Sequence, residues 1–152
     1  MTWVPKNDVV VPVDFSDPSL AAIDTALALV DDPKRVHVIH VLPVMTDYEL
    51  GMVWSNINDE QRTEQARTAI AERLADAKYK GMQVEIGLGD PGHEIVDYAE
   101  SIHADLIVMP SHSRSGLTRL LIGSVAERVV RLAHCGVLVL KDPERAARAA
   151  PQ

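Results

Sequence analysis

The 152-residue sequence has a single cysteine, and aromatic residues make up only 4% of it. One thiol excludes an internal disulfide and a thiolate metal cluster. No apolar run approaches the roughly 18 residues that a membrane-spanning helix requires, so we expect no association with a membrane. The first residues also lack a basic region followed by a long apolar stretch, which argues against a signal peptide. The expected location is the cytoplasm.

Positive charge is scarce as well, because 15 Lys and Arg residues stand against 22 Asp and Glu residues, for a net charge of -7. Such a surface repels the phosphate backbone of nucleic acids, so we do not expect a DNA or RNA partner. The sequences of common catalytic sites are missing too: there is no G-x-x-x-x-G-K-[ST] loop, no G-x-S-x-G turn and no H-E-x-x-H pair. We therefore predict no catalytic residues.

The residues that could bind a metal are badly placed for it. His37 and His40 are three apart on an expected strand and should point to opposite faces. His93 and Asp97 are four apart on an expected helix, but two ligands do not make a metal site. Cys135 is interpreted as a small apolar residue packed before a strand rather than as a reactive thiol. No protein metal site is predicted.

What the sequence does contain is an alternation of short apolar runs and amphipathic segments. Runs rich in Val, Ile and Leu predict strands over residues 9–13, 36–42, 82–88, 104–109 and 136–140. Apolar residues at helical spacing predict helices over residues 16–30, 59–80, 91–103 and 123–134. This order is typical of a doubly wound α/β domain, in which helices cover both faces of a parallel sheet.

The length corresponds to one domain, which we place at residues 1–142, with 143–152 as a disordered or frayed tail. One connection, from Pro43 to Asp59, is unusually long for a compact domain and is typical of a lid, a partner surface or a mobile segment. Met52 and Trp54 lie in this connection, where they could cover a ligand, although packing against the domain is the preferred interpretation.

The segment from Val108 to Ser124 joins an expected strand to an expected helix through a loop of small residues. Backbone N–H groups of a tight loop and of the helix that opens at Gly123 and Ser124 would converge on one point. The positive end of the helix dipole would lie behind that point. Such an arrangement binds anions, and the expected ligand is a phosphate group.

The spacing of Pro110, Ser113, Gly123 and Ser124 resembles the nucleotide-binding pattern G-x2-G-x9-G-[ST] of the universal stress protein family. Pro110 and Ser113 stand where the family has glycine. The resemblance extends over four further stretches, residues 9–16, 40–41, 105–109 and 123–127. It implies a Rossmann-like sheet of order 3-2-1-4-5, similar to the adenine nucleotide alpha hydrolases.

In a sheet of this order the switch point falls between the first and fourth strands, and ligands bind beyond the carboxyl ends of the strands there. The resemblance implies that the ligand is ATP or another adenine nucleotide, with Mg²⁺ held through the phosphate oxygens. It assigns the base and ribose to Pro12, Val13, Asp14, Val41 and Met109. It assigns the phosphates to Pro110, Ser113, Gly123, Ser124 and Val125. Arg114 is a better candidate than Arg119 for added positive charge.

Some of these residues have a second interpretation. Asp14 could bind a ribose hydroxyl or an adenine amino group, or it could cap the first helix, for which Ser16 is an equally good candidate. Ser124 could contact a phosphate or cap its helix. Pro110 has no N–H to donate to a phosphate. Ser113 adds a Cβ where glycine would allow a close approach or a positive φ, but its hydroxyl could donate to a phosphate.

His112, in the same loop, is given a structural role rather than an acid–base role. The family resemblance further implies a homodimer, formed by pairing of the last strand, Val137 to Leu140, with its copy. The leading hypothesis is thus a nucleotide-binding regulatory module of the stress response, at most a slow ATP hydrolase, that acts through an unidentified protein partner.

The alternative hypothesis is a dimeric adaptor of the same fold, in which Pro110 and Ser113 have removed nucleotide affinity. A receiver-like domain that uses Asp14 and Lys141 has little support, because no acidic cluster accompanies Asp14.

Overall fold

The computed structural model of the chain describes residues 3–45, 58–111 and 122–142, and every structural statement below concerns these ranges. Several predictions fall outside them: those for Met52, Trp54, His112, Ser113, Arg114, Arg119 and the tail 143–152. Five parallel strands form one sheet in the order β3-β2-β1-β4-β5. The predicted strand order and fold class are confirmed. The strands are β1 (Val9–Pro12), β2 (Val36–Leu42), β3 (Gln83–Leu88), β4 (Leu106–Pro110) and β5 (Gly136–Leu140).

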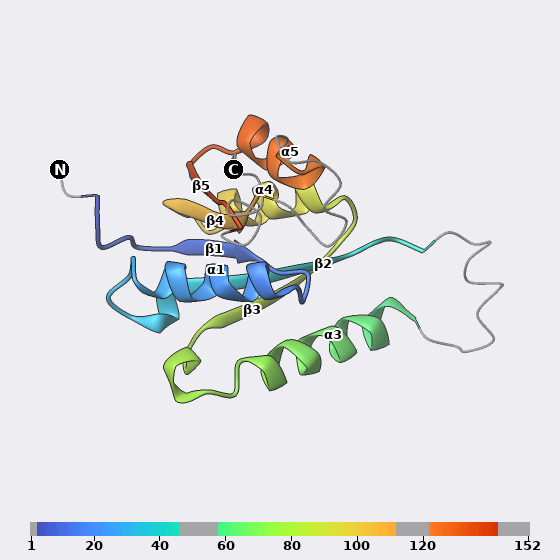
Figure 1. Cartoon of the computed structure of the whole chain (residues 1–152). Coiled ribbons are helices and arrows are strands. Elements are labelled where there is room, and N and C mark those ends of the chain that lie inside the picture. The colour runs from blue at the N-terminus through green and yellow to red at the C-terminus, as the bar shows by residue number, and fades with distance from the viewer. Residues whose placement is uncertain (1–2, 46–57, 112–121, 143–152) are drawn as a thin grey trace, which may run out of the picture.

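Helices cover both faces of this sheet. Figure 1 shows α1 (Asp17–Leu27) and α3 (Asp59–Arg73) on one face, and α4 (Pro91–Ser101) and α5 (Ser124–Leu132) on the other. Two short 3-10 turns, η1 (Pro33–Arg35) and η2 (Ala77–Tyr79), follow α1 and α3. No helix in the described ranges is long and apolar enough to span a bilayer.

The predicted helix over residues 59–80 is too long. α3 ends at Arg73, and Leu74 is its C-cap. Asp76 then caps the separate turn η2, since its carboxylate accepts a hydrogen bond of 3.0 Å from the Lys78 N–H. A hydrogen bond from a nearby backbone N–H to an aspartate side chain competes with continuation of the helix. The apolar residues nevertheless keep their helical spacing beyond Asp76, which is why the predicted helix was too long.

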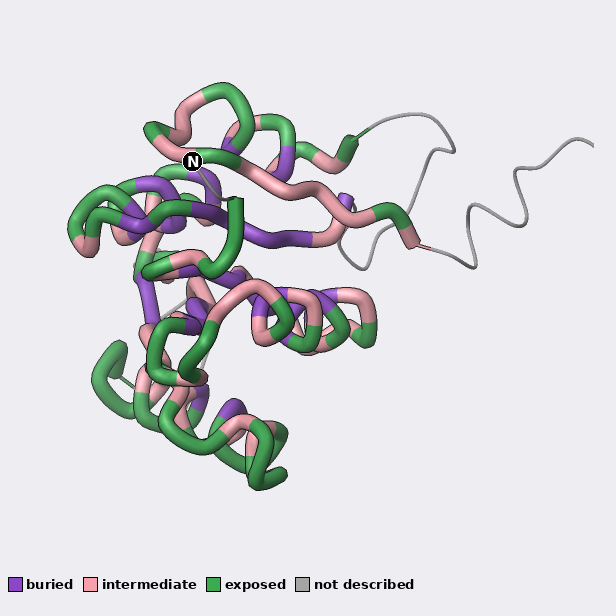
Figure 2. Tube along the Cα trace, turned by 90° about the vertical axis from the view of Figure 1, so that its left-hand side faces the viewer, coloured by how far each residue is buried: buried purple, intermediate pink, exposed green. Residues whose placement is uncertain are grey.

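The strands are continuous apolar runs because both faces of the sheet are buried. Val9 and Val11 pack toward α1 and α3, whereas Val10 packs toward α4 and α5, and all three are 0% exposed. Figure 2 shows buried residues concentrated along the strands, with exposed positions on the outer surfaces of the helices. Burial of each valine side chain contributes about 1.5–3 kcal/mol, which makes the two apolar layers the main stabilising feature of the fold.

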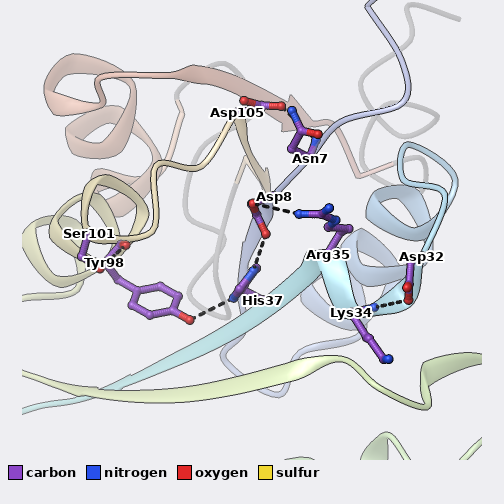
Figure 3. A network of polar contacts seen from close by, with 9 residues as sticks. All are labelled: Asn7, Asp8, Asp32, Lys34, Arg35, His37, Tyr98, Ser101 and Asp105. Carbon is purple, nitrogen blue, oxygen red and sulfur yellow. Dashed lines mark hydrogen bonds and ion pairs between the residues drawn. The ribbon is translucent and has the colours of Figure 1, made fainter.

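A polar network anchors α4 at the end of the sheet where the strands begin (Figure 3). His37 on β2 contacts Asp8 through Nε2 at 2.9 Å and the hydroxyl of Tyr98 on α4 through Nδ1 at 3.1 Å. Arg35 lies 3.6 Å from the same Asp8 carboxylate. His40, on the opposite face of β2, contacts Phe15 instead, so the prediction that His37 and His40 diverge is confirmed.

Candidate functional site

A cavity of about 290 Å³ opens beyond the carboxyl ends of β1 and β4, at the switch point of the sheet. We call it the switch-point cavity. Nine of the eleven predicted site residues line it: Pro12, Val13, Asp14, Val41, Met109, Pro110, Gly123, Ser124 and Val125. The other two, Ser113 and Arg114, lie outside the described residues.

Seven further residues line the cavity that sequence reasoning did not assign to it: Ser19, Ile39, His40, Pro91, Ile95, Ser111 and Ala126. Five of them come from elements that the nucleotide-binding pattern does not include, namely Ser19 on α1, two residues of β2 and two of α4. Pro91 and Ile95 are on the first turn and a half of α4, and Ile39 precedes the pair His40 and Val41 on β2. The position of His40 beside Val41 in the sequence is a signal that could have identified it.

One part of the cavity is apolar. Ile39, Ile95 and Met109 are each at least 96% buried and bring together β2, α4 and β4. Val41 and Pro91 complete the same lining. We call this part of the cavity the apolar slot. An apolar lining with a few polar groups at its rim is typical of a site that binds a small molecule.

The polar part of the cavity begins at the turn after β1. Asp14 accepts hydrogen bonds through Oδ1 from the Ser16 N–H at 3.0 Å and from the Ser16 hydroxyl. Ser16, not Asp14, is the N-cap of α1, because its side chain accepts from the Ser19 N–H. Ser19 is only 1% exposed; its hydroxyl donates to the Ser16 carbonyl at 2.9 Å and accepts from the Asp14 N–H at 3.3 Å.

The first turn of α5 borders the cavity on the other side. Gly123 is the N-cap and makes no side-chain capping bond, so the interpretation of Ser124 as the cap is wrong. The Gly123 N–H donates to the Ser111 carbonyl at 2.7 Å, which joins the end of β4 to the start of α5. Ser124, Val125 and Ala126 follow as the first helical residues, and all three line the cavity. Their N–H groups have no acceptor within the helix and carry the positive end of its dipole.

Pro110 lies at the end of β4, where it pairs with Leu140, rather than in the loop that follows. The next residue, Ser111, donates its N–H to the Leu140 carbonyl at 2.8 Å. The strand ladder thus continues past the proline. The missing N–H of Pro110 is accommodated at the end of the strand, where its ring contributes an apolar wall to the cavity.

The chain matches the model of the Universal stress protein family over residues 7–141. It belongs to the universal stress protein family. Universal stress protein MJ0531 of Methanocaldococcus jannaschii is 37% identical over 141 residues, which cover 90% of this chain and 83% of that protein.

Solved universal stress proteins share the architecture. The structure of MJ0577, also from Methanocaldococcus jannaschii, is 27% identical and superposes with a TM-score of 0.72, covering 91% of this chain and 98% of the other. A universal stress protein solved in complex with cAMP superposes with a TM-score of 0.62 at 21% identity, covering 90% and 97% of the two chains. The similarity to the second structure shows a common fold.

In this universal stress protein, α4 and α5 are joined beside the cavity through Asp90, the N-cap of α4. Its carboxylate accepts from the side chain of His93 at 2.8 Å, from the backbone N–H of His93 at 3.0 Å and from Arg128 on α5. The hydrogen bonds from His93, reinforced by Arg128, hold the pKa of Asp90 well below its ordinary value. Asp90 is therefore ionised across the physiological range.

Within the described ranges no three His, Cys, Asp or Glu side chains are grouped so that they could hold a metal ion. Cys135 is partly buried and packs against the apolar layer beneath α4 and α5. Burial raises the pKa of its thiol above the ordinary value. This environment agrees with the interpretation of Cys135 as a packing residue, since a raised pKa leaves less of the reactive thiolate.

Proposed function

We propose that this universal stress protein binds an adenine nucleotide in the switch-point cavity and acts as a regulatory module of the stress response in the cytoplasm. The observation that carries the proposal is the composition of that one cavity. An apolar slot, the Asp14 carboxylate and the first turn of α5 all border a space of about 290 Å³. These three features match the base, the sugar and the phosphates of a nucleotide.

The adenine ring is assigned to the slot between Val41, Ile95 and Met109, where its faces would replace water against buried apolar side chains. The ribose is assigned to Asp14, whose carboxylate accepts hydrogen bonds from hydroxyl groups. The phosphates are assigned to the N–H groups of Ser124 and Val125 at the start of α5.

ATP is the proposed nucleotide, with Mg²⁺ held by the phosphate oxygens rather than by protein ligands. The fold is compatible with such a ligand, since a protein of the same fold was solved with cAMP. Ser113 and Arg114, which follow Ser111 in the sequence, remain proposed phosphate contacts.

Calorimetric titration of nucleotide-stripped protein with Mg-ATP tests the proposal, together with chromatography of any nucleotide that co-purifies. Micromolar affinity or co-purified adenine nucleotide is the expected result. Val41→Trp should fill the slot and weaken binding by tenfold or more, at least about 1.4 kcal/mol. Val130→Trp is the matched control, because Val130 lies on α5 and is exposed outside the cavity. Absence of binding by the unmodified protein would refute the proposal.

A second candidate is a dimeric adaptor that works through a protein partner. Strand β5 lies at an edge of the sheet and pairs with β4, and its residues Val137 to Leu140 are only partly buried. We propose that two copies pair along this apolar edge, because an exposed strand edge tends to recruit another strand. Sedimentation velocity should show a dimer that Val139→Lys dissociates. A monomer at tens of micromolar concentration would contradict the dimer.

Reversion of Ser113 to glycine separates the two candidates. If the Cβ of Ser113 crowds the phosphate, Ser113→Gly should tighten Mg-ATP binding. Unchanged affinity in a protein that binds ATP would remove the crowding argument. Failure of both forms to bind ATP, with the dimer intact, would favour the adaptor.

A further inference from the structure

The turn that carries Asp14 into the switch-point cavity has an unusual backbone. Phe15, the next residue, has a φ of 64°, in the left-handed region that non-glycine residues rarely adopt. Left-handed backbone at a bulky residue persists only where surrounding contacts hold it, and such positions cluster at binding sites. The contacts that hold Phe15 therefore also determine where Asp14 lies.

His40, on the neighbouring strand β2, supplies two of these contacts. Its Nδ1 lies 2.7 Å from the carbonyl oxygen of Val13, the residue before Asp14. A carbonyl oxygen only accepts hydrogen bonds, so Nδ1 carries a hydrogen and donates it. The His40 ring also packs edge-on against the ring of Phe15, with the ring centres 4.8 Å apart. His40 thus holds the turn on both sides of Asp14.

Two further backbone N–H groups of the turn are held by β2 and α1. The Val13 N–H donates to the Ile39 carbonyl at 2.8 Å, and the Asp14 N–H donates to the buried Ser19 hydroxyl at 3.3 Å. His40 differs from Ile39 and Ser19 because its side chain contacts both neighbours of Asp14, whereas each of the other two accepts from a single backbone N–H. It is the side chain through which the end of β2 could set the position of the Asp14 carboxylate relative to a ligand.

We propose that His40 is a positioning residue for the sugar of the bound nucleotide. Its Nδ1–H bond to Val13 and its packing on Phe15 hold the turn in which Asp14 faces the ribose hydroxyls. This inference rests on the proposed function and adds to it. It assigns sugar discrimination to a pair of residues, Asp14 and the His40 that holds it, rather than to Asp14 alone.

The test compares AMP with 2′,3′-dideoxy-AMP, which lacks both ribose hydroxyls, by calorimetric titration. A hydrogen bond to a carboxylate predicts that the unmodified protein prefers AMP by about tenfold or more. His40→Phe keeps a ring beside Phe15 but removes the donor to Val13. It should reduce the ratio of the affinities for AMP and the dideoxy analogue toward one. His40→Asn places an amide donor where Nδ1 was and should restore part of the preference.

The ratio of the two affinities distinguishes positioning from general loosening of the cavity. If His40→Phe weakens both nucleotides equally and leaves the ratio unchanged, the proposal is overturned. His37→Phe, the same substitution at the other end of β2, is the matched control and should leave the ratio unaltered. Should His40→Phe not fold, Phe15→Ala removes the ring contact and keeps the Nδ1–H donor to Val13, and an unchanged ratio in that variant overturns the proposal as well.

Failure of the proposed function gives a different result. In that case the unmodified protein binds neither AMP nor Mg-ATP, before any variant is compared. A protein that binds AMP but does not discriminate against the dideoxy analogue keeps the proposed function and loses the role of His40.

Discussion

Arg128 on α5 donates a hydrogen bond to Asp90, the N-cap of α4, so an ion pair joins two of the helices that border the switch-point cavity. Both side chains are about two-fifths exposed. Exposed pairs stabilise a fold only weakly, so the contribution of this pair to overall stability should be small and should decrease with added salt. Its main consequence is geometric, because it sets the start of α4 relative to α5.

The low pKa of Asp90 predicts a pH-dependent contribution to folding. Asn is also a good N-cap, so Asp90→Asn keeps the cap and removes the charge. Because the pKa is depressed in the folded chain, the stabilisation is fully present above the ordinary value of 3.8. It is lost progressively as the pH falls below 3.8 toward the folded value. Urea unfolding should show Asp90→Asn less stable at neutral pH, with a difference that shrinks below 3.8; a difference independent of pH would contradict this.

Gly92 should resist a substitution that usually stabilises helices. A Cβ at this position would lie 2.5 Å from Cδ and 2.8 Å from Cγ of Arg128. Glycine to alanine in a helix normally gains about 0.5–1 kcal/mol, but here the Arg128 side chain must move and its bond to Asp90 is disturbed. We expect Gly92→Ala to show no gain in the unmodified background.

Of the three Arg128 atoms nearest to the added Cβ, Arg128→Ala leaves only the Arg128 Cβ, at 3.0 Å. The gain of Gly92→Ala should then return, so a double-mutant cycle should give a coupling of about 1 kcal/mol. Thermal or urea unfolding of the four proteins provides the measurement. Additive effects would show that Arg128 does not limit the space at Gly92.

Tyr98→Phe should remove the anchor between α4 and β2. Burial, with the negative charges of Glu85 and Asp8, raises the pKa of Tyr98, so its phenol stays protonated, and its hydroxyl is hydrogen-bonded to Nδ1 of His37 at 3.1 Å. Loss of this partly buried bond should reduce the free energy of unfolding by about 1 kcal/mol in urea titrations. Tyr79→Phe is the control, because the Tyr79 hydroxyl donates to Asp24 at an exposed site.

The raised pKa of Tyr98 also predicts how the stability difference between the unmodified protein and Tyr98→Phe changes at high pH. The contribution of Tyr98 should be present below its ordinary value of 10.0 and lost as the pH rises through the higher folded value. The stabilities of the unmodified protein and Tyr98→Phe should therefore converge at high pH. A gap that persists there would indicate that packing, not the hydrogen bond, distinguishes the two proteins.

Cys135 should react slowly with thiol reagents. Burial, reinforced by the negative charge of Asp105, raises its pKa and lowers the thiolate fraction at neutral pH. Reaction with a disulfide reagent such as DTNB should be slower than that of free cysteine. The rate should recover when the chain is unfolded in urea. A folded-state rate above that of free cysteine would mark Cys135 as an activated thiol instead.

Local patterns in the sequence were enough to predict the architecture. Continuous apolar strands alternate with amphipathic helices because a parallel sheet must be covered on both faces, and this requirement is visible at each element separately. The ends of the helices and strands were predicted less accurately. Asp76 begins a new turn by a local side-chain bond, so α3 stops at Arg73 although the apolar spacing continues.

The candidate site, too, was predicted in part from the sequence and decided in part by the structure. Asp14, Met109 and Gly123 could be placed together because the switch point of the sheet brings the ends of β1 and β4 to the start of α5. The sequence alone left the cap of α1 undecided between Asp14 and Ser16. The structure decides for Ser16, since only the folded turn shows which oxygen reaches the Ser19 N–H.

The sequence by itself determined the parallel sheet and its covering helices, because these follow from periodicity, and its resemblance to the universal stress proteins implied the strand order and the residues at the switch point. Only the tertiary structure brought His40, Ser19 and Ile95 to the same cavity and placed Phe15 in a left-handed turn. Those features depend on how side chains from distant segments pack against one another. Such packing is decided by the shape of the assembled core, which no local pattern encodes.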